Sequence, residues 1–135
     1  MLQKSRRKPR ITISEGDYER LGNLVTAYEK RGLEIAASLA EELDRARIVS
    51  DTSIAAGIVR MGSTVSYVID GDHGKKVVLV YPADANIEEG RIAITTPVGT
   101  ALIGLKAGQS ISFAARNGQI HDLTVTEVSP PARAE

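Results

Sequence analysis

Apolar residues recur at helical spacing over the first part of the chain. They are separated by three, four and three residues and fall at Tyr18, Leu21, Val25 and Tyr28. This is the spacing of one helix face. Ser14 can cap the start of the helix, Asp17 stands at the capping-box position, and Gly32 can adopt the left-handed conformation that ends a helix. The pattern predicts a first helix between Ser14 and Gly32.

A second apolar stripe with the same spacing follows directly. It consists of Ala36, Leu39, Leu43 and Ala46. It predicts a helix from about Leu33 to Val49, joined to the first by a short glycine turn. Two such helices form an antiparallel hairpin with arms of about 15 residues, or roughly 22 Å at 1.5 Å per residue. The hairpin could supply core alone. It could also pair with a second copy if a stripe such as Leu21, Leu24 and Val25 were exposed.

The apolar period changes after a small, polar linker at Ser50–Gly57. Alternating or short apolar runs predict strands at 58–61, 64–69, 76–81, 91–95, 110–115 and 120–128. Thr96 and Pro97 suit the cap and first position of a short helix, and Asn117-Gly118 is a hairpin signal. The pattern predicts an α+β fold, in which a short helical hairpin precedes an antiparallel sheet module with one short helix.

The charge is distributed unevenly along the chain, although 17 basic and 17 acidic side chains balance. Five basic residues and no acid stand in the first ten, and the other 125 residues carry a net charge of −5. We expect residues 1–10 to form a basic, flexible tail that is either simply solvated or contacts nucleic acid or an acidic partner. The acidic body argues against a nucleic-acid-binding face, so contact with nucleic acid would be indirect or through this tail.

The amino-acid composition excludes several classes of protein. The chain has no cysteine, which excludes disulfides, zinc ribbons, iron–sulfur clusters and thiol nucleophiles. It has no apolar run near the roughly 20 residues of a membrane helix, and no apolar segment follows the basic N-terminus as in a signal peptide. We therefore expect a cytoplasmic protein with no membrane contact.

Candidate catalytic groups are sparse. His73 and His121 are the only imidazoles, and His73 lies in a glycine- and aspartate-rich turn. The segment Gly99–Lys106 resembles a phosphate loop in its two glycines, but Leu105 separates Gly104 from the lysine. We predict no enzymatic activity, no cofactor and no small-molecule substrate.

The hairpin tip carries the one pair of acids worth weighing as metal ligands. Glu29 and Glu34 flank the turn, and their oxygens would suit a divalent cation. Lys30 and Arg31 lie between them and compete for those charges. We therefore interpret the tip as ordinary helix-end charges and predict no metal.

The order of the parts resembles the bacterial GreA/GreB transcription elongation factor family. The resemblance is carried by Gly62–Tyr67 at the start of the module and by the segment Ile94–Leu105, and it covers residues 11–129. Within the family, Ala40–Arg47 and Leu79–Ala83 look like the Rnk branch, the regulators of nucleoside diphosphate kinase. The implied parts are a coiled-coil hairpin (11–50), a linker with a first short strand (51–61), an FKBP-like domain (62–129) and a tail (130–135).

The resemblance implies a regulator that binds bacterial RNA polymerase near its secondary channel and competes with Gre-type factors without cleaving the transcript. The family docks through the loop before its short helix, which corresponds to Thr95, Thr96 and Pro97. A purely structural capping role for Thr96 and Pro97 is the alternative.

Three other functions stay open. The first is true transcript cleavage with Glu29 and Glu34 as metal ligands, although arms of about 22 Å are half as long as those of the cleavage factors. The second is prolyl isomerisation, because the module resembles the FKBP fold, although its aromatic residues are only Tyr67, Tyr81 and Phe113. The third is binding of another protein, nucleoside diphosphate kinase included.

Overall fold

A computed structural model describes residues 8–131 of the chain, apart from the side chain of His73, and its first helix begins at the predicted cap. Helix α1 spans Glu15–Lys30, and the Ser14 side chain accepts a hydrogen bond from the backbone N–H of Asp17 at 3.2 Å. Gly32 has φ 71°, so it ends the helix as expected. Both predicted tails lie mostly outside the described residues. This holds for residues 1–7 of the basic tail predicted over residues 1–10, and for residues 132–135 of the predicted C-terminal tail.

The second helix is shorter than predicted. Helix α2 spans Ile35–Arg45, and the chain turns extended at Ala46. The segment Arg47–Val49 is strand β2, which pairs in parallel with strand β1, Thr12–Ser14. The prediction that the helix continues to Val49 is therefore wrong. The β-branched Ile48 and Val49 favour an extended backbone, and β1 supplies hydrogen-bonding partners for it.

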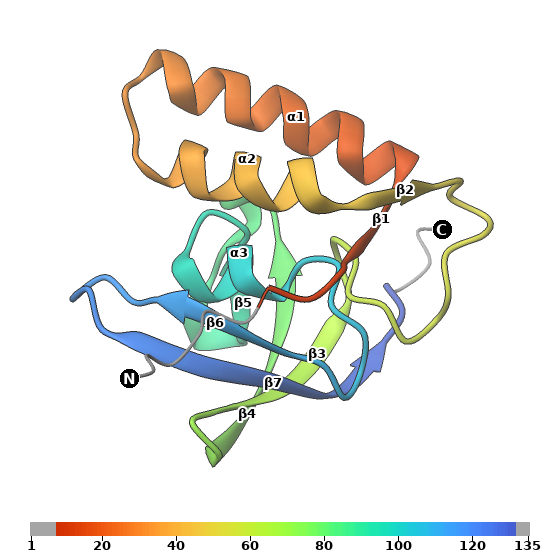
Figure 1. Cartoon of the computed structure of the whole chain (residues 1–135), viewed down its shortest axis with the longest axis vertical. Coiled ribbons are helices and arrows are strands. Elements are labelled where there is room, and N and C mark those ends of the chain that lie inside the picture. The colour runs from red at the N-terminus through yellow and green to blue at the C-terminus, as the bar shows by residue number, and fades with distance from the viewer. Residues whose placement is uncertain (1–7, 132–135) are drawn as a thin grey trace, which may run out of the picture.

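Five strands form one curled sheet in the order β5-β4-β3-β7-β6 (Figure 1). Their bounds are Thr64–Ile69 for β3, Asp72–Val80 for β4, Arg91–Ala93 for β5, Ser110–Ala114 for β6 and Ile120–Ser129 for β7. The α+β class is confirmed, but the sheet is mixed, because β5 pairs in parallel with β4. Two short 3-10 turns, η1 (Pro82–Asp84) and η2 (Ile87–Glu89), carry the chain back so that β5 runs in the same direction as β4.

Two predicted strands start or end differently. Strand β4 begins at Asp72, because Asp70 and Gly71 have φ 53° and 75° and close a two-residue hairpin turn. The short strand predicted at 58–61 is reduced to a single bridge between Ile58 and Lys106.

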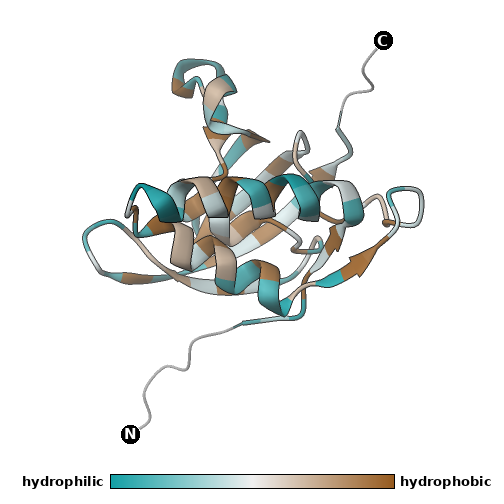
Figure 2. Ribbon diagram, turned by 90° about the horizontal axis from the view of Figure 1, so that it is seen from above, coloured by the Kyte–Doolittle hydropathy of each residue, from teal (hydrophilic) through white to brown (hydrophobic). Residues whose placement is uncertain are grey.

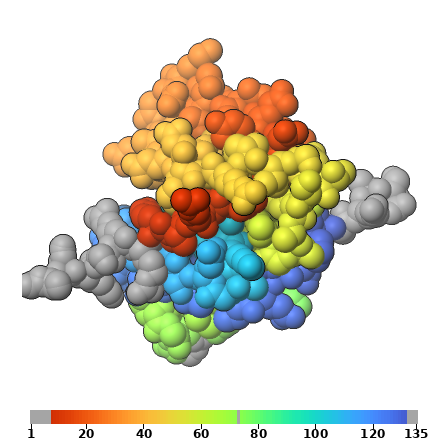
Figure 3. Space-filling view, turned by 45° about the vertical axis from the view of Figure 1, so that its right-hand side comes forward, coloured from red at the N-terminus to blue at the C-terminus, as the bar shows by residue number. Residues whose placement is uncertain are grey.

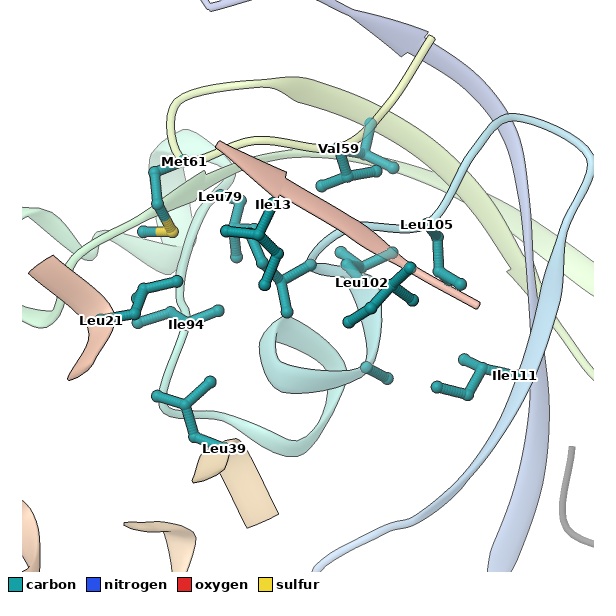
Figure 4. Packing of buried hydrophobic residues seen from close by; sticks show 14 of the residues in the cluster. Ile13, Leu21, Leu39, Val59, Met61, Leu79, Ile94, Leu102, Leu105 and Ile111 are labelled. Atoms are coloured by element: carbon teal, nitrogen blue, oxygen red, sulfur yellow. The ribbon is translucent and has the colours of Figure 1, made fainter. Parts of the chain in front are cut away.

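The hairpin and the sheet share one buried apolar cluster. Seen from above, α1 and α2 lie side by side over the sheet (Figure 2), and α2 lies next to the short helix α3, Pro97–Leu102 (Figure 1). Leu21 and Leu39 from the hairpin lie in the same cluster as Ile94, which Figure 4 shows next to Leu21. The apolar stripe that could have formed a dimer interface therefore packs within the molecule, since Leu21 and Val25 are buried. No helix of the described part is long and apolar enough to cross a membrane.

A buried carboxylate fastens the first turn of α1 to the module. Asp17 is only 4% exposed. Its Oδ2 accepts the backbone N–H of Met61 at 3.1 Å, and its Oδ1 accepts Nη2 of Arg20 at 2.9 Å. Nε of Arg20 in turn donates to the Tyr81 hydroxyl at 3.2 Å. The capping-box role predicted for Asp17 is thus replaced by a link between α1 and the chain that enters β3.

The pKa values of two side chains in this link, Arg20 and Tyr81, are raised. The hydrogen bonds to Tyr81 and then to Asp17 raise the pKa of Arg20 above its ordinary value. Burial raises the pKa of Tyr81, whose phenol oxygen accepts the hydrogen bond from Arg20.

Replacing Asp17 by alanine should destabilise the protein, because the Met61 N–H loses its acceptor in a buried position. The expected loss in free energy of unfolding is about 1–3 kcal/mol, measured by urea denaturation. Asp44→Ala is the matched control, since Asp44 is an exposed carboxylate on α2 and its removal should cost less than about 0.5 kcal/mol. Equal losses in the two variants would contradict the role assigned to Asp17.

Candidate functional site

The loop before α3 forms a sharp, well-ordered corner at Thr95–Pro97. Oγ1 of Thr96 accepts the backbone N–H of Gly99 at 3.0 Å and donates to the carbonyl oxygen of Ala93 at 2.8 Å. Pro97 occupies the first turn of the helix. The predicted capping of α3 by Thr96 is therefore confirmed, and it fixes the backbone on both sides of Pro97.

Gly99 lets α3 pack directly on the preceding backbone. A Cβ added there would lie 2.9 Å from the Cα of Ile94 and closer still to the carbonyl oxygen of Ala93. Neither atom can move aside without shifting the main chain. The glycine that looked like part of a degenerate phosphate loop therefore has a packing role, and it makes the corner rigid.

An apolar groove of about 480 Å³ lies on one side of the corner. Its apolar lining includes Tyr67, Ile69, Ile92, Val98 and Phe113. Burial raises the pKa of the Tyr67 phenol above its ordinary value. The groove also reaches Thr96 and Pro97, so the corner forms one of its walls.

A second groove, which we call the acidic groove, lies on the other side of the corner and has a volume of about 770 Å³. Glu34, Glu41 and Glu42 line it from the α2 side, and residues of the edge strand β6 form another wall. Lys8 and Arg116 add two basic side chains to the lining. Thr95 and Pro97 form part of its wall. Pro97 therefore stands on a ridge between an apolar and an acidic groove.

The structure brings only part of the predicted hairpin tip to this place. Glu34 lines the acidic groove together with Thr95 and Pro97, whereas Glu29, Lys30 and Arg31 are exposed outside its lining. The guanidinium of Arg31 lies 5.3 Å from the centre of the Tyr28 ring. Among residues 8–131, no group of three or more His, Asp or Glu side chains is placed to hold a metal ion.

His121 is part of the site, although no sequence motif connects it with the corner. Its Nδ1 lies 2.7 Å from Oδ2 of Asp70, and its ring lies 5.9 Å from that of Phe113. His121 lines the apolar groove with Tyr67 and Phe113. Phe113 in β6 and His121 in β7 face each other across the hairpin that Asn117-Gly118 predicts, whereas Tyr67 in β3 is far from both in the sequence. The hairpin signal and the alternation of apolar residues were the only hints that these residues share a face.

Comparison with known proteins agrees with this architecture. Residues 54–130 match the family model "Transcription elongation factor, GreA/GreB, C-term", and residues 9–49 match "Rnk N-terminus". A solved structure described as prokaryotic transcription elongation factor GreA/GreB from Nitrosomonas europaea superposes with a TM-score of 0.70 at 34% identity. It covers 90% of this chain and 99% of that one. The chain belongs to the GreA/GreB family of transcription elongation factors.

Within the family the chain has the Rnk type of N-terminal segment. It is 35% identical to the regulator of nucleoside diphosphate kinase of Escherichia coli (strain K12) over 123 residues, 90% of each chain. It is also 37% identical to transcription elongation factor GreA of Nitrobacter hamburgensis, over 67% of this chain and 59% of that protein. The resemblance inferred from the sequence is confirmed at both levels.

Removing the Thr96 hydroxyl should lower stability, since two hydrogen bonds at the corner depend on it. Thr96→Ala should cost about 1 kcal/mol of unfolding free energy, and Thr96→Ser should recover most of that loss because serine caps equally well. Urea denaturation of the three proteins measures this. A serine variant as unstable as the alanine variant would show that the methyl group, and not the cap, matters.

Proposed function

We propose that this protein is a transcription regulator that binds bacterial RNA polymerase near its secondary channel and competes there with Gre-type factors. It acts in the cytoplasm, and its relatives' name links it to nucleoside diphosphate kinase. The observation that carries the proposal is the rigid ridge at Thr95–Pro97, which stands between two grooves on an otherwise packed module. A partner protein can contact such a ridge on both sides, through the apolar groove and through the acidic groove.

The hairpin supports docking without transcript cleavage. Helix α1 has 16 residues and α2 has 11, or about 24 and 16 Å at 1.5 Å per residue. Both helices lie along the module (Figure 1), so their tip does not stand out from it as a long probe. Residues Glu15–Arg47 hold eight acids against five bases, a charge that would steer the hairpin towards a channel lined with basic groups.

The docking surface is tested with the double variant Thr95→Ala/Pro97→Ala, which leaves the Thr96 cap in place. Affinity for core RNA polymerase, measured by fluorescence anisotropy, should fall at least about tenfold, a loss of about 1.4 kcal/mol. Glu127→Ala is the control, because Glu127 is exposed on β7 and lines neither groove. Unchanged affinity in the double variant would reject this surface, and no binding by the unaltered protein would reject polymerase as the partner.

Backtracked elongation complexes test whether the protein is a true cleavage factor. We expect no release of short 3′ RNA fragments, because the hairpin is short and Lys30 and Arg31 stand between the tip acids. Fragment release that disappears in Glu29→Gln/Glu34→Gln would replace our proposal with a cleavage function that uses those carboxylates.

The apolar groove favours a second candidate, prolyl isomerisation or another form of peptide binding. Tyr67, Ile92 and Phe113 give it an apolar lining that would accept a peptide side chain. A peptide isomerisation assay separates the two candidates, because docking on polymerase requires no turnover.

A further inference from the structure

The apolar groove is a part of the module that the hairpin does not cover. No residue of α1 or α2 belongs to its lining, which comes mostly from β3, β5, β6, β7 and the first turn of α3. On the face seen in Figure 3, by contrast, the hairpin (orange and yellow) and the first described residues (red) pack against the module (cyan and blue). The groove has a volume of about 480 Å³, within the range of roughly 300–1,000 Å³ that is typical of ligand sites.

The groove contains a phenol hydroxyl that the protein leaves without a partner. Tyr67 is only 4% exposed, and its hydroxyl makes no hydrogen bond to any of the described residues 8–131. The only fully enclosed side-chain nitrogen or oxygen without a partner in this range is Nε of Arg60, so the Tyr67 hydroxyl meets open space. Tyr67 lines the apolar groove and not the acidic groove. The hydroxyl therefore faces the apolar groove, where it can donate a hydrogen bond to a ligand.

The walls around this hydroxyl restrict the chemistry of the occupant. Ile69, Ile92, Val98 and Phe113 surround it with apolar surface. A purely apolar occupant would remove the Tyr67 hydroxyl from water and leave it unpaired, which is costly. The occupant that fits is an apolar group beside an oxygen acceptor. A peptide residue with an apolar side chain has both, because its backbone carbonyl is the acceptor.

The charge at the rim of the groove favours an acidic neighbour to that residue. Arg116 and His121 belong to the lining, and no lining residue is acidic. Nδ1 of His121 is already engaged by Oδ2 of Asp70 at 2.7 Å. Arg116, which borders both grooves, has no ion-pair or hydrogen-bond partner among residues 8–131. Its guanidinium is therefore available to a carboxylate of the occupant.

We propose that the apolar groove binds a segment of a partner polypeptide in which an apolar residue is followed by an acid. The apolar side chain fills the groove, the Tyr67 hydroxyl donates to the backbone carbonyl oxygen of that residue, and Arg116 pairs with the acid. The groove shares Thr96 and Pro97 with the ridge, so the same partner can contact both. Only the identification of this partner with polymerase rests on the proposed function.

The hydroxyl is tested by its removal. Tyr67→Phe keeps the apolar wall and should leave the midpoint of urea denaturation unchanged, because no hydrogen bond within the protein is lost. Tyr81→Phe is the matched control, since the Tyr81 hydroxyl accepts from Nε of Arg20 at 3.2 Å and lines neither groove. It should lower the midpoint and leave peptide binding unchanged. A clear fall of the midpoint in Tyr67→Phe would overturn the proposal, because the hydroxyl would then have a partner inside the protein.

Peptide binding is measured with the blocked dipeptide acetyl-Leu-Asp-amide, titrated into the isotope-labelled full chain. We expect saturable shifts of the backbone NMR signals of Ile92 and Phe113 at millimolar concentration. Tyr67→Phe should weaken the affinity about three- to tenfold, the effect of one hydrogen bond. Equal affinities of Tyr67→Phe and the unaltered protein, or no saturable shift, would contradict the proposal. Shifts of the same signals on concentrating the protein without peptide would also contradict it, because a second copy would then fill the groove.

The acid is tested with acetyl-Leu-Asn-amide, which has the same shape as the first peptide without its charge. It should bind about two- to fivefold more weakly, the effect of one exposed ion pair. This preference should disappear in Arg116→Gln. Equal affinities of the two peptides for the unaltered protein would reject the acidic neighbour and with it the proposed occupant.

Polymerase binding is measured separately. If core polymerase supplies the segment, Tyr67→Phe should lower the affinity of the full chain for it about three- to tenfold, and Tyr81→Phe should not. Unchanged affinity in Tyr67→Phe would reject polymerase as the source of the segment. The peptide titration contains no polymerase, so its result stands or fails whatever polymerase does.

Discussion

The apolar contact between the helical hairpin and α3 determines where every other functional element lies. Leu21 and Leu39 are buried in the same cluster as Ile94 and Leu102, and each such side chain contributes roughly 1.5–3 kcal/mol when removed from water. The contact is not directional, so the hydrogen bond from Met61 to the buried Asp17 fixes how α1 begins over the module. Together they place Glu34, at the start of α2, in the same groove as Thr95 and Pro97 of the ridge.

The ridge itself is stiff because its backbone is held by hydrogen bonds and close packing. The side chain of Thr96 bonds to main chain on both sides of Pro97, and Gly99 allows α3 to pack against the carbonyl of Ala93. A preformed surface loses little conformational entropy on binding. This stiffness favours the docking role that we propose for the segment, although its side chains are small.

The periodic and capping signals of the sequence were sufficient for the helices and for most of the sheet. The start of α1 at Ser14, its end at Gly32 and the cap of α3 at Thr96 are local interactions, so local residues reveal them. The pairing of β1 with β2 could not be predicted, because three-residue strands show too little alternation and their partners are 35 residues apart. The two grooves could not be predicted either, because the apolar groove combines residues of β3, β5, β6 and β7, and the acidic groove combines residues of α2, α3 and β6.

The short ladder between β1 and β2 has a mechanical consequence. The chain enters the hairpin through β1 and leaves it through β2, and these two segments are hydrogen-bonded side by side. A domain attached by one extended strand can swivel, whereas a bonded pair of strands resists both twisting and bending. The hydrogen bond from the Thr12 N–H to the Gly104 carbonyl also ties this pair of strands to the module, so a force on the hairpin is passed to the module through bonded backbone.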